Sequence, residues 1–142
     1  MTLSDIYRVI QTKVNTLTGQ TYVLTRNPQQ NFSEGTSGVY RYLQPTGVSK
    51  ERRSQGVPET IVQVKVGILQ ASGKEADISS AEDEIDSMLN AILRSAQVGD
   101  NLIVYASQTA PVGEHYLDAD GLDAEVPVLE ATATIAIRVY YV

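Results

Sequence analysis

The stretch LEATATIAIRVYY, residues 129–141, decides the fold class. Its odd positions are all apolar or small, whereas its even positions carry polar, charged and aromatic side chains together with one alanine. Successive side chains of a strand point to opposite faces, so this alternation predicts a long β-strand with one hydrophobic face. The pattern is typical of an antiparallel sheet that is covered on one side, and it predicts that the other face is free for solvent or a partner.

Two amphipathic helices are predicted to cover the hydrophobic face. Apolar residues recur at spacings of three and four over residues 3–18 and again over Ser79–Ala96. Thr2 or Ser4 suits the N-cap of the first helix, and Gly19 is a stop signal. Ser79 followed three residues later by Glu82 fits a capping box at the start of the second helix.

Further strands are predicted over residues 22–25, 39–44 and 60–70, between the two helices, and over residues 101–106, after the second helix. Gly67, inside the third of these, indicates a bulge or a close approach by another backbone. Together the elements predict a single α+β domain over residues 1–142. Its two layers are a mainly antiparallel β-sheet and two amphipathic helices on one face.

Long loops are predicted at about 27–38, 45–58 and 107–128, and two of them carry opposite charge. The segment PTGVSKERRSQGVP, residues 45–58, contains Lys50, Arg52 and Arg53, whereas residues 107–127 contain acidic side chains but no Lys or Arg. Loops of this length are usually functional or mobile. One interpretation is that the basic loop of one copy contacts the acidic loop of the next in a ring. The alternatives are a solvated loop and direct phosphate contact.

The composition excludes several kinds of chemistry. The chain has 142 residues with no cysteine and one histidine, His115, so disulfides, thiolate metal sites and histidine clusters are excluded by counting. His115 is interpreted as a loop histidine, and neither a nucleophile elbow nor a phosphate-binding glycine loop is present. We therefore predict no catalytic residue, no cofactor and no enzyme activity.

The acidic run from Asp118 through Asp120 to Asp123 superficially resembles a calcium loop. Counted from Asp118, however, position 6 is an aspartate and position 12 is Leu129, where an EF-hand needs glycine and glutamate. A solvated acidic turn is the preferred interpretation, with a weak cation site as the alternative. No metal site is predicted.

The charge balance disfavours nucleic acid as a general ligand. The formal net charge is -6, whereas affinity for nucleic acid comes mainly from neutralising phosphates. No apolar run reaches the roughly 20 residues that a membrane-spanning helix needs, and the first residues do not read as a signal peptide. The expectation from sequence is a soluble, intracellular protein with no membrane partner.

The order of the elements resembles that of the tail terminator proteins of long-tailed bacteriophages. The resemblance rests on the helix near Met1, the polar middle, the long strand at 60–70, the capped helix at 79–96 and the last strand, ATATIAIRVYYV. It covers nearly the whole chain but includes no diagnostic residue. Related head–tail joining proteins of the neck have a similar pattern.

The resemblance implies a structural protein of the virion, assembled in the host cytoplasm. Its subunits would form a homo-oligomeric ring, a hexamer in this family, on the last ring of the tail tube. The ring would end polymerisation of the tube and join it to the neck or connector protein, while DNA only passes through the lumen. From exposure and charge, three surfaces are predicted to contact a partner or a second subunit. They are Lys50, Arg52 and Arg53; Asp118, Asp120 and Asp123; and Thr134, Arg138 and Tyr140.

Three alternative classes remain open at this point. The first is a neck, stopper or head-completion protein of the same viruses. The second is a non-viral binding module that uses the free face of the sheet. The third, an enzyme built on an α+β sheet, is disfavoured because the chain has one histidine and no cysteine.

Overall fold

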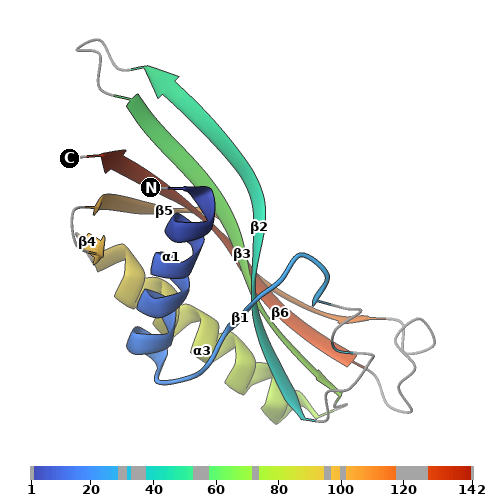
Figure 1. Cartoon of the computed structure of the whole chain (residues 1–142). Helices are drawn as coiled ribbons and strands as arrows, with labels where there is room; N and C mark the ends of the chain where they lie inside the picture. The colour runs from blue at the N-terminus through green and yellow to red at the C-terminus, as the bar shows by residue number, and fades with distance from the viewer. Residues whose placement is uncertain are drawn as a thin grey trace.

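A computed structural model describes residues 2–28, 32, 38–52, 58–71, 74–94, 97–99, 102–117 and 128–141. Two helices, α1 (Leu3–Thr18) and α3 (Glu75–Arg94), lie against a six-stranded sheet (Figure 1). For β4, for β5 and for residues 51–52, 58–59 and 140–141 at the ends of the other long strands, only the backbone is described. The strands are β1 (Val23–Leu24), β2 (Val39–Arg52), β3 (Pro58–Ala71), β4 (Gln97–Gly99), β5 (Leu102–Leu117) and β6 (Val128–Tyr141).

Helix α1 has the bounds that the sequence predicts, and its ends show why. Thr2 caps it: the Thr2 hydroxyl accepts from the Asp5 N–H at 3.2 Å, and the Asp5 carboxylate accepts from the Thr2 N–H at 2.9 Å. This reciprocal pair satisfies amide groups that the first turn leaves without partners. At the other end Gly19 adopts a left-handed conformation with φ 68°, and its N–H donates to the Asn15 carbonyl.

Helix α3 begins four residues before its predicted start. The helix starts at Glu75, and the Lys74 carbonyl accepts from the N–H groups of Asp77 and Ile78. The capping-box prediction at Ser79 is therefore wrong, because Ser79 lies inside the helix. The preceding residues include no helix breaker, so the helix extends back through them. Residues 95 and 96, at the predicted end, lie outside the described part.

The sheet has the order β1-β2-β3-β6-β5-β4. Neighbouring strands are antiparallel except β1 and β2, which are parallel. The predicted α+β class with a mainly antiparallel sheet is confirmed. Strand β6 is also confirmed, and it lies at the centre, between β3 and β5.

Strand β2 does not end at Pro45, so the prediction of a loop from 45 to 58 is wrong for most of its length. Residues 45–52 continue the strand, and its last residue lies opposite Pro58 of β3. Proline is tolerated there because, among the described strands, β1 pairs with β2 at Tyr42 and Leu43 alone, so β2 is an edge strand beyond them. A bulge between Pro45 and Gly47 absorbs the irregularity. Residues 53–57 lie outside the described part.

Strand β5 likewise extends well past its predicted end at residue 106. Residues 107–117 are strand rather than loop, and His115, predicted in a loop, lies opposite Glu130. Their sequence does not alternate because bulges interrupt the ladder between Gln108 and Ala110 and between Ala110 and Gly113. The short strand β4 was not predicted. Residues 118–127 and most of the predicted loop at 27–38 lie outside the described part.

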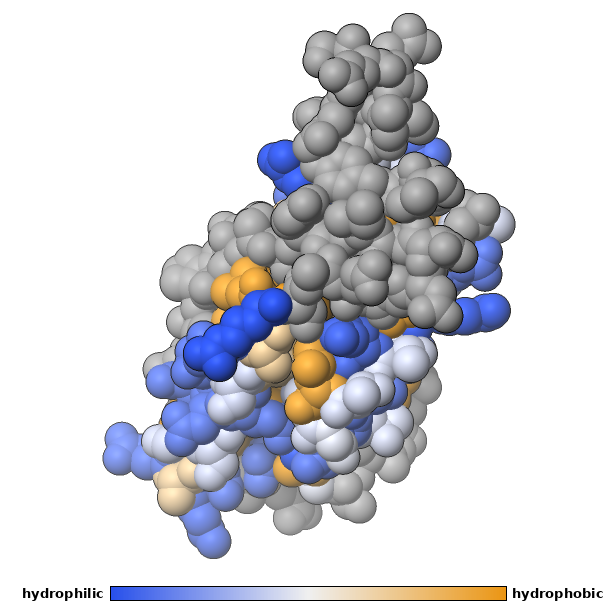
Figure 2. Space-filling model, turned by 90° about the vertical axis from the view of Figure 1, so that its left-hand side faces the viewer, coloured by the Kyte–Doolittle hydropathy of each residue, from blue (hydrophilic) through white to orange (hydrophobic). Residues whose placement is uncertain are grey.

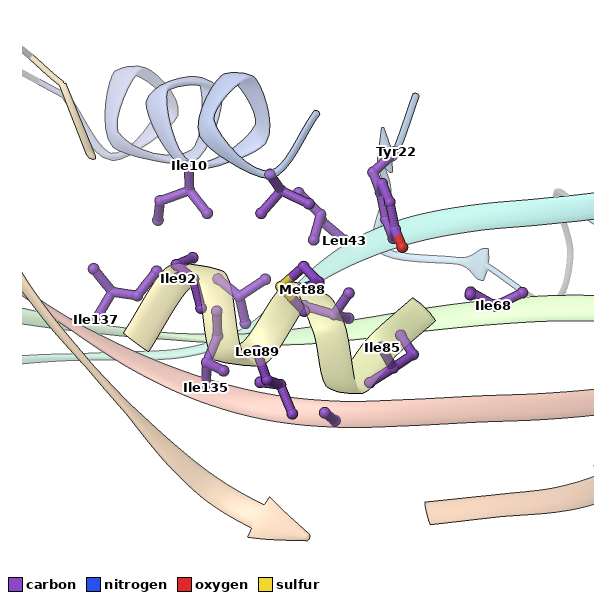
Figure 3. Packing of buried hydrophobic residues seen from close by; sticks show 14 of the residues in the cluster. Ile10, Tyr22, Leu43, Ile68, Ile85, Met88, Leu89, Ile92, Ile135 and Ile137 are labelled. Atoms are coloured by element: carbon purple, nitrogen blue, oxygen red, sulfur yellow. The ribbon is translucent and has the colours of Figure 1, made fainter. Parts of the chain in front are cut away.

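The main core lies between the helices and the facing side chains of the sheet (Figure 3). The odd-numbered side chains of β6 from Leu129 to Val139 are all buried, as the alternation predicts. They share one cluster with even-numbered residues of β3 and with the apolar stripes of both helices. The helix contribution comes from Ile6, Tyr7, Ile10, Val14, Ala81, Ile85, Met88, Leu89 and Ile92.

Candidate functional site: the outer face, the edges and the ends of the sheet

The face of the sheet opposite the main core, here called the outer face, is partly covered. A second cluster forms there from Phe32, Tyr40, Tyr42, Leu69 and Val128. The rings of Tyr40 and Tyr42 stack with centroids 6.2 Å apart. The prediction of a free face is therefore wrong at this end of the sheet, because aromatic side chains of β2 fold across it.

Gly67 makes room for one of these rings. A Cβ atom at Gly67 would lie 2.2 Å from Cζ of Tyr42, which is far inside van der Waals contact. The predicted close approach is real, but the approaching group is a side chain and not a backbone. No bulge interrupts β3 at this position.

Tyr42 reaches across Gly67 to a buried carboxylate. Its hydroxyl donates to Oε2 of Glu130 at 3.2 Å, and Nζ of Lys65 lies 3.7 Å from Oε1 of the same residue. Glu130 is only 2% exposed, so its carboxyl group relies on polar partners in the protein in place of water. Burial, and then the neighbouring carboxylate, raise the pKa of Tyr42, which keeps the phenol protonated and able to donate. The arrangement ties β2, β3 and β6 together.

A second polar cluster lies on the helix side. Nε and Nη2 of Arg41 donate to the two carboxylate oxygens of Glu84 at 2.7 and 2.8 Å, and the hydroxyl of Tyr22 donates to Oε2 at 2.6 Å. Burial alone would raise the pKa of Glu84, but the hydrogen bonds from Arg41 and Tyr22 outweigh it and lower that pKa. These bonds fasten α3 to β2. Arg41 and Glu84 line a shallow pocket of about 210 Å³, and their opposite charges pair there.

The helix side offers no broad apolar surface within the described residues. Viewed from the left-hand side of Figure 1, its hydrophobic residues form separate patches among hydrophilic ones (Figure 2). In this part of the chain neither helix is long and apolar enough to span a membrane, and no group of three or more potential metal ligands is present.

Both edges of the sheet are covered over only a short length by described strands. On one side β1 pairs with β2 at Tyr42 and Leu43 alone. On the other side β4 pairs with β5 at Leu102 and Ile103 alone. An uncovered edge exposes backbone donors and acceptors that can pair with another chain. Val48, on the uncovered part of β2, is a large hydrophobic side chain that is 39% exposed.

The predicted interface residues are placed at different points of this sheet. Lys50 is exposed on β2, and Arg52 is the last residue of that strand. On β6, Thr134 is half-buried, Arg138 is exposed and the backbone of Tyr140 lies opposite Glu59. Arg53, Asp118, Asp120 and Asp123 lie outside the described residues.

The basic and the acidic segments are attached to opposite ends of the sheet. The basic segment leaves β2 at Arg52 and returns at Pro58, where these two residues face each other. The acidic segment leaves β5 at Leu117 and returns at Val128, which lies opposite Ala71 at the far end of β3. Figure 1 shows the β2–β3 end extending past α1, away from the β5–β6 end. The sequence pattern did not predict this separation, because it depends on strand order.

No family model matches this sequence, and no curated protein shows significant similarity to it.

Proposed function

We propose that this chain is a structural protein of a bacteriophage virion. It forms a ring that caps the tail tube, ends its polymerisation and joins it to the head connector. The resemblance of the element order to tail terminators suggests the class. The subunit contacts its own copies, the tail tube protein and the connector, and DNA passes through the lumen. A hexamer is the expected ring size, and the ring is assembled in the host cytoplasm.

One observation carries the proposal: two segments of opposite charge are attached to opposite ends of the sheet. Residues 45–58 have a net charge of +2, from Lys50, Arg52, Arg53 and one glutamate. Residues 107–127 hold five acidic side chains and no Lys or Arg. In a ring whose subunits share one orientation, with their strands along the ring axis, one rim is therefore basic and the other acidic. Electrostatic complementarity favours the correct partner and excludes the wrong one, so one rim can bind the tube while the other rejects further tube subunits.

This geometry changes the role expected of the basic segment. In a ring whose subunits stand side by side, the basic segment of one copy lies at the opposite end from the acidic segment of the next. The two segments meet only when molecules stack end to end. We therefore propose that the side chains of Arg52, Arg53, Asp118, Asp120 and Asp123 contact partners above and below the ring, and that Lys50, which lies earlier on β2, contacts the neighbouring subunit.

The test combines the mass of the protein with its effect on tubes. Light scattering over a concentration series is expected to show a species about six times the chain mass of 15.5 kDa. Added to polymerising tail tube protein from the same genome, the protein is expected to bind one end and shorten the tubes in electron micrographs. Reversing Arg52 and Arg53 to Glu is expected to abolish tube binding while the ring persists.

Two results would redirect the assignment. A ring that binds isolated connectors but leaves tube length unchanged would indicate the neck or stopper protein instead. A chain that remains monomeric and binds neither tubes nor connectors would refute a virion role and favour the non-viral binding module. The control is a charge reversal away from both ends of the sheet. Lys65→Glu on the outer face is unsuitable, because Lys65 pairs with Glu130. Lys13→Glu on α1 is the better control.

A further inference from the structure

Among the described residues, no strand pairs with β2 beyond Leu43 on the side away from β3, and this is called the free edge of β2. Its backbone groups point outward at alternate residues, and one hydrogen bond establishes which ones. The N–H of Thr25 donates to the carbonyl of Leu43 at 3.0 Å, so the backbone of Leu43 faces β1 and not β3. Residues of an antiparallel pair alternate between facing the partner and facing away from it. Leu43 lies opposite Val66. Each β2 residue that lies opposite an even-numbered residue of β3 therefore has its backbone N–H and C=O groups pointing away from β3.

This alternation continues past the bulge because β3 itself is regular. Val48, Lys50 and Arg52 lie opposite even-numbered residues of β3, so their N–H and C=O groups point away from the sheet. The same rule explains two prolines. Pro45 and Pro58 each lie at a position where no hydrogen bond crosses between β2 and β3, so the N–H that proline lacks is not needed there.

The edge of β5 carries a matching set. The even-numbered residues of β3 bond to the odd-numbered residues of β6, so the even-numbered residues of β6 bond to β5. Leu102 lies opposite an odd-numbered residue of β6 and faces outward, in agreement with its pairing to Gly99 of β4. Beyond the reach of β4, the next residues that face outward are Val104, Ala106 and Gln108.

Each of the two free segments adjoins a bulge. Residues 48–52 of β2 follow a bulge, and residues 104–108 of β5 precede one. Each segment is a regular stretch of five residues with outward backbone groups at its first, third and fifth positions. Each therefore offers the other a ladder of equal length.

Strand direction favours an antiparallel junction. From β2 across to β5 the strands alternate in direction, so β5 runs opposite to β2. Copies related by rotation about an axis along the strands keep this relation, so β5 of one copy lies antiparallel to β2 of the next. If Ala106 of one copy lies opposite Lys50 of the next, β4 of the first copy lies beyond one end of the junction. β1 of the second copy lies beyond the other end. A parallel junction would instead bring β4 and β1 to the same end.

We propose that the free edge of β2 pairs antiparallel with the free edge of β5 of a neighbouring copy. Residues 48–52 lie against residues 104–108, and one continuous sheet runs around the ring. The contact is heterologous, since two different edges meet, and such contacts close into rings or grow into filaments. The inference deepens the ring of the proposed function and rests on it, but it specifies the atoms that join the subunits.

The test begins with one backbone substitution and a matched control. Lys50→Pro removes an N–H that faces the neighbour but no bond to β3, whereas Lys50→Gln removes only the charge. Loss of a buried hydrogen bond that leaves its acceptor without a partner is expected to raise the assembly concentration about tenfold or more for Lys50→Pro. Lys50→Gln is expected to assemble like the parent chain. Circular dichroism of the Lys50→Pro monomer checks that the fold persists.

A second variant covers the case in which Lys50→Pro does not fold. The chain has no cysteine, so Lys50→Cys combined with Ala106→Cys introduces one pair into a clean background. Residues directly opposite in an antiparallel ladder have Cα atoms about 5.5 Å apart, within the span of a disulfide. Oxidation of the double variant is expected to give a ladder of covalent oligomers up to the ring size. Neither single variant is expected to do so.

The outcomes distinguish the junction from the ring. If rings form and neither Lys50→Pro nor the cysteine pair affects or links them, the edge pairing is refuted and the ring stands. Covalent dimers that form from Lys50→Cys alone as fast as oligomers form from the double variant would favour β2 against β2 and refute the proposal. A parent chain that forms no ring, alone or on tube ends, overturns both the junction and the proposed function.

Discussion

The two faces of the sheet use the same strands but are stabilised in different ways. The face that packs against the helices is stabilised by a broad apolar cluster from five elements of the fold, to which many side chains contribute. The outer face depends on a few particular contacts: the Tyr42 ring over Gly67, and the bonds of Glu130 with Tyr42 and Lys65. An apolar face tolerates variation in detail, whereas a buried charge depends on each of its partners. The contrast leads to four predictions, from the largest effect to the smallest.

The largest effect is expected on the helix side. Ile85 is completely buried at the contact of α3 with the sheet, so Ile85→Ala should lower the free energy of unfolding by about 3 kcal/mol. Leu93→Ala is the control on the same helix, because Leu93 is 42% exposed and should cost less than about 1 kcal/mol. Urea denaturation followed by circular dichroism measures both. Equal losses for the two variants would show that α3 does not pack as described.

The next effect tests the glycine of the outer face. Gly67→Ala places a methyl group against the Tyr42 ring and should cost about 2 kcal/mol through overpacking. Gly47→Ala, also in the sheet, is the control, since its nearest neighbour is the end of the Gln63 side chain at 3.8 Å. Adding Tyr42→Ala to Gly67→Ala should show strong coupling between the two sites. Additive costs would mean that the ring does not lie over residue 67.

A smaller effect is expected from the hydroxyl that donates to Glu130. Tyr42→Phe keeps the ring but removes the donor at 3.2 Å, and it should cost about 1 kcal/mol. The control is the same change made together with Glu130→Gln, in a double-mutant cycle measured by thermal unfolding. If Tyr42→Phe costs as much in the Glu130→Gln background as in the parent chain, the bond to the carboxylate contributes nothing specific.

The smallest effect is a pH dependence from the helix side. The pKa of Glu84 is lowered in the folded chain, so its stabilisation is complete above the ordinary carboxyl pKa and is lost as the pH falls through the folded value. Glu84→Gln should therefore lose less melting temperature than the parent between pH 6 and pH 3, by an amount that corresponds to about 1 kcal/mol. Asp83→Asn, at an exposed neighbour, should follow the parent. A parent-like acid profile for Glu84→Gln would remove Glu84 from the acid response.

Periodicity predicted the elements whose pattern is regular and failed where the pattern is interrupted. α1 and β6 were predicted almost to the residue, because their apolar spacing is unbroken. β2 and β5 were predicted too short, because Pro45, Pro111 and the neighbouring glycines read locally as turns. A proline at an outward-facing position of an edge strand costs no ladder bond, but only the pairing shows that the position is at an edge.

The residues of the candidate site likewise divide into those that a sequence pattern selected and those that only the structure revealed. Charge counting selected Lys50 and Arg52 as candidates, and alternation predicted that the even-numbered residues of β6 lie on the face opposite the main core. No local pattern indicated that Glu130 would be buried or that Gly67 would hold Tyr42. A glutamate at an even position of a half-exposed strand reads as a solvated residue until the ring that covers it is known.

By itself the sequence determined the α+β class, the first helix, the long central strand and the opposite charges of two segments, because each is recorded within a short window of residues. Only the tertiary structure decided the order of the strands, and with it which edges stay uncovered. The same order separates the charged segments to opposite ends of the sheet. These properties arise from pairings between residues far apart in the chain, and hydrogen-bond alternation then determines which backbone groups face outward.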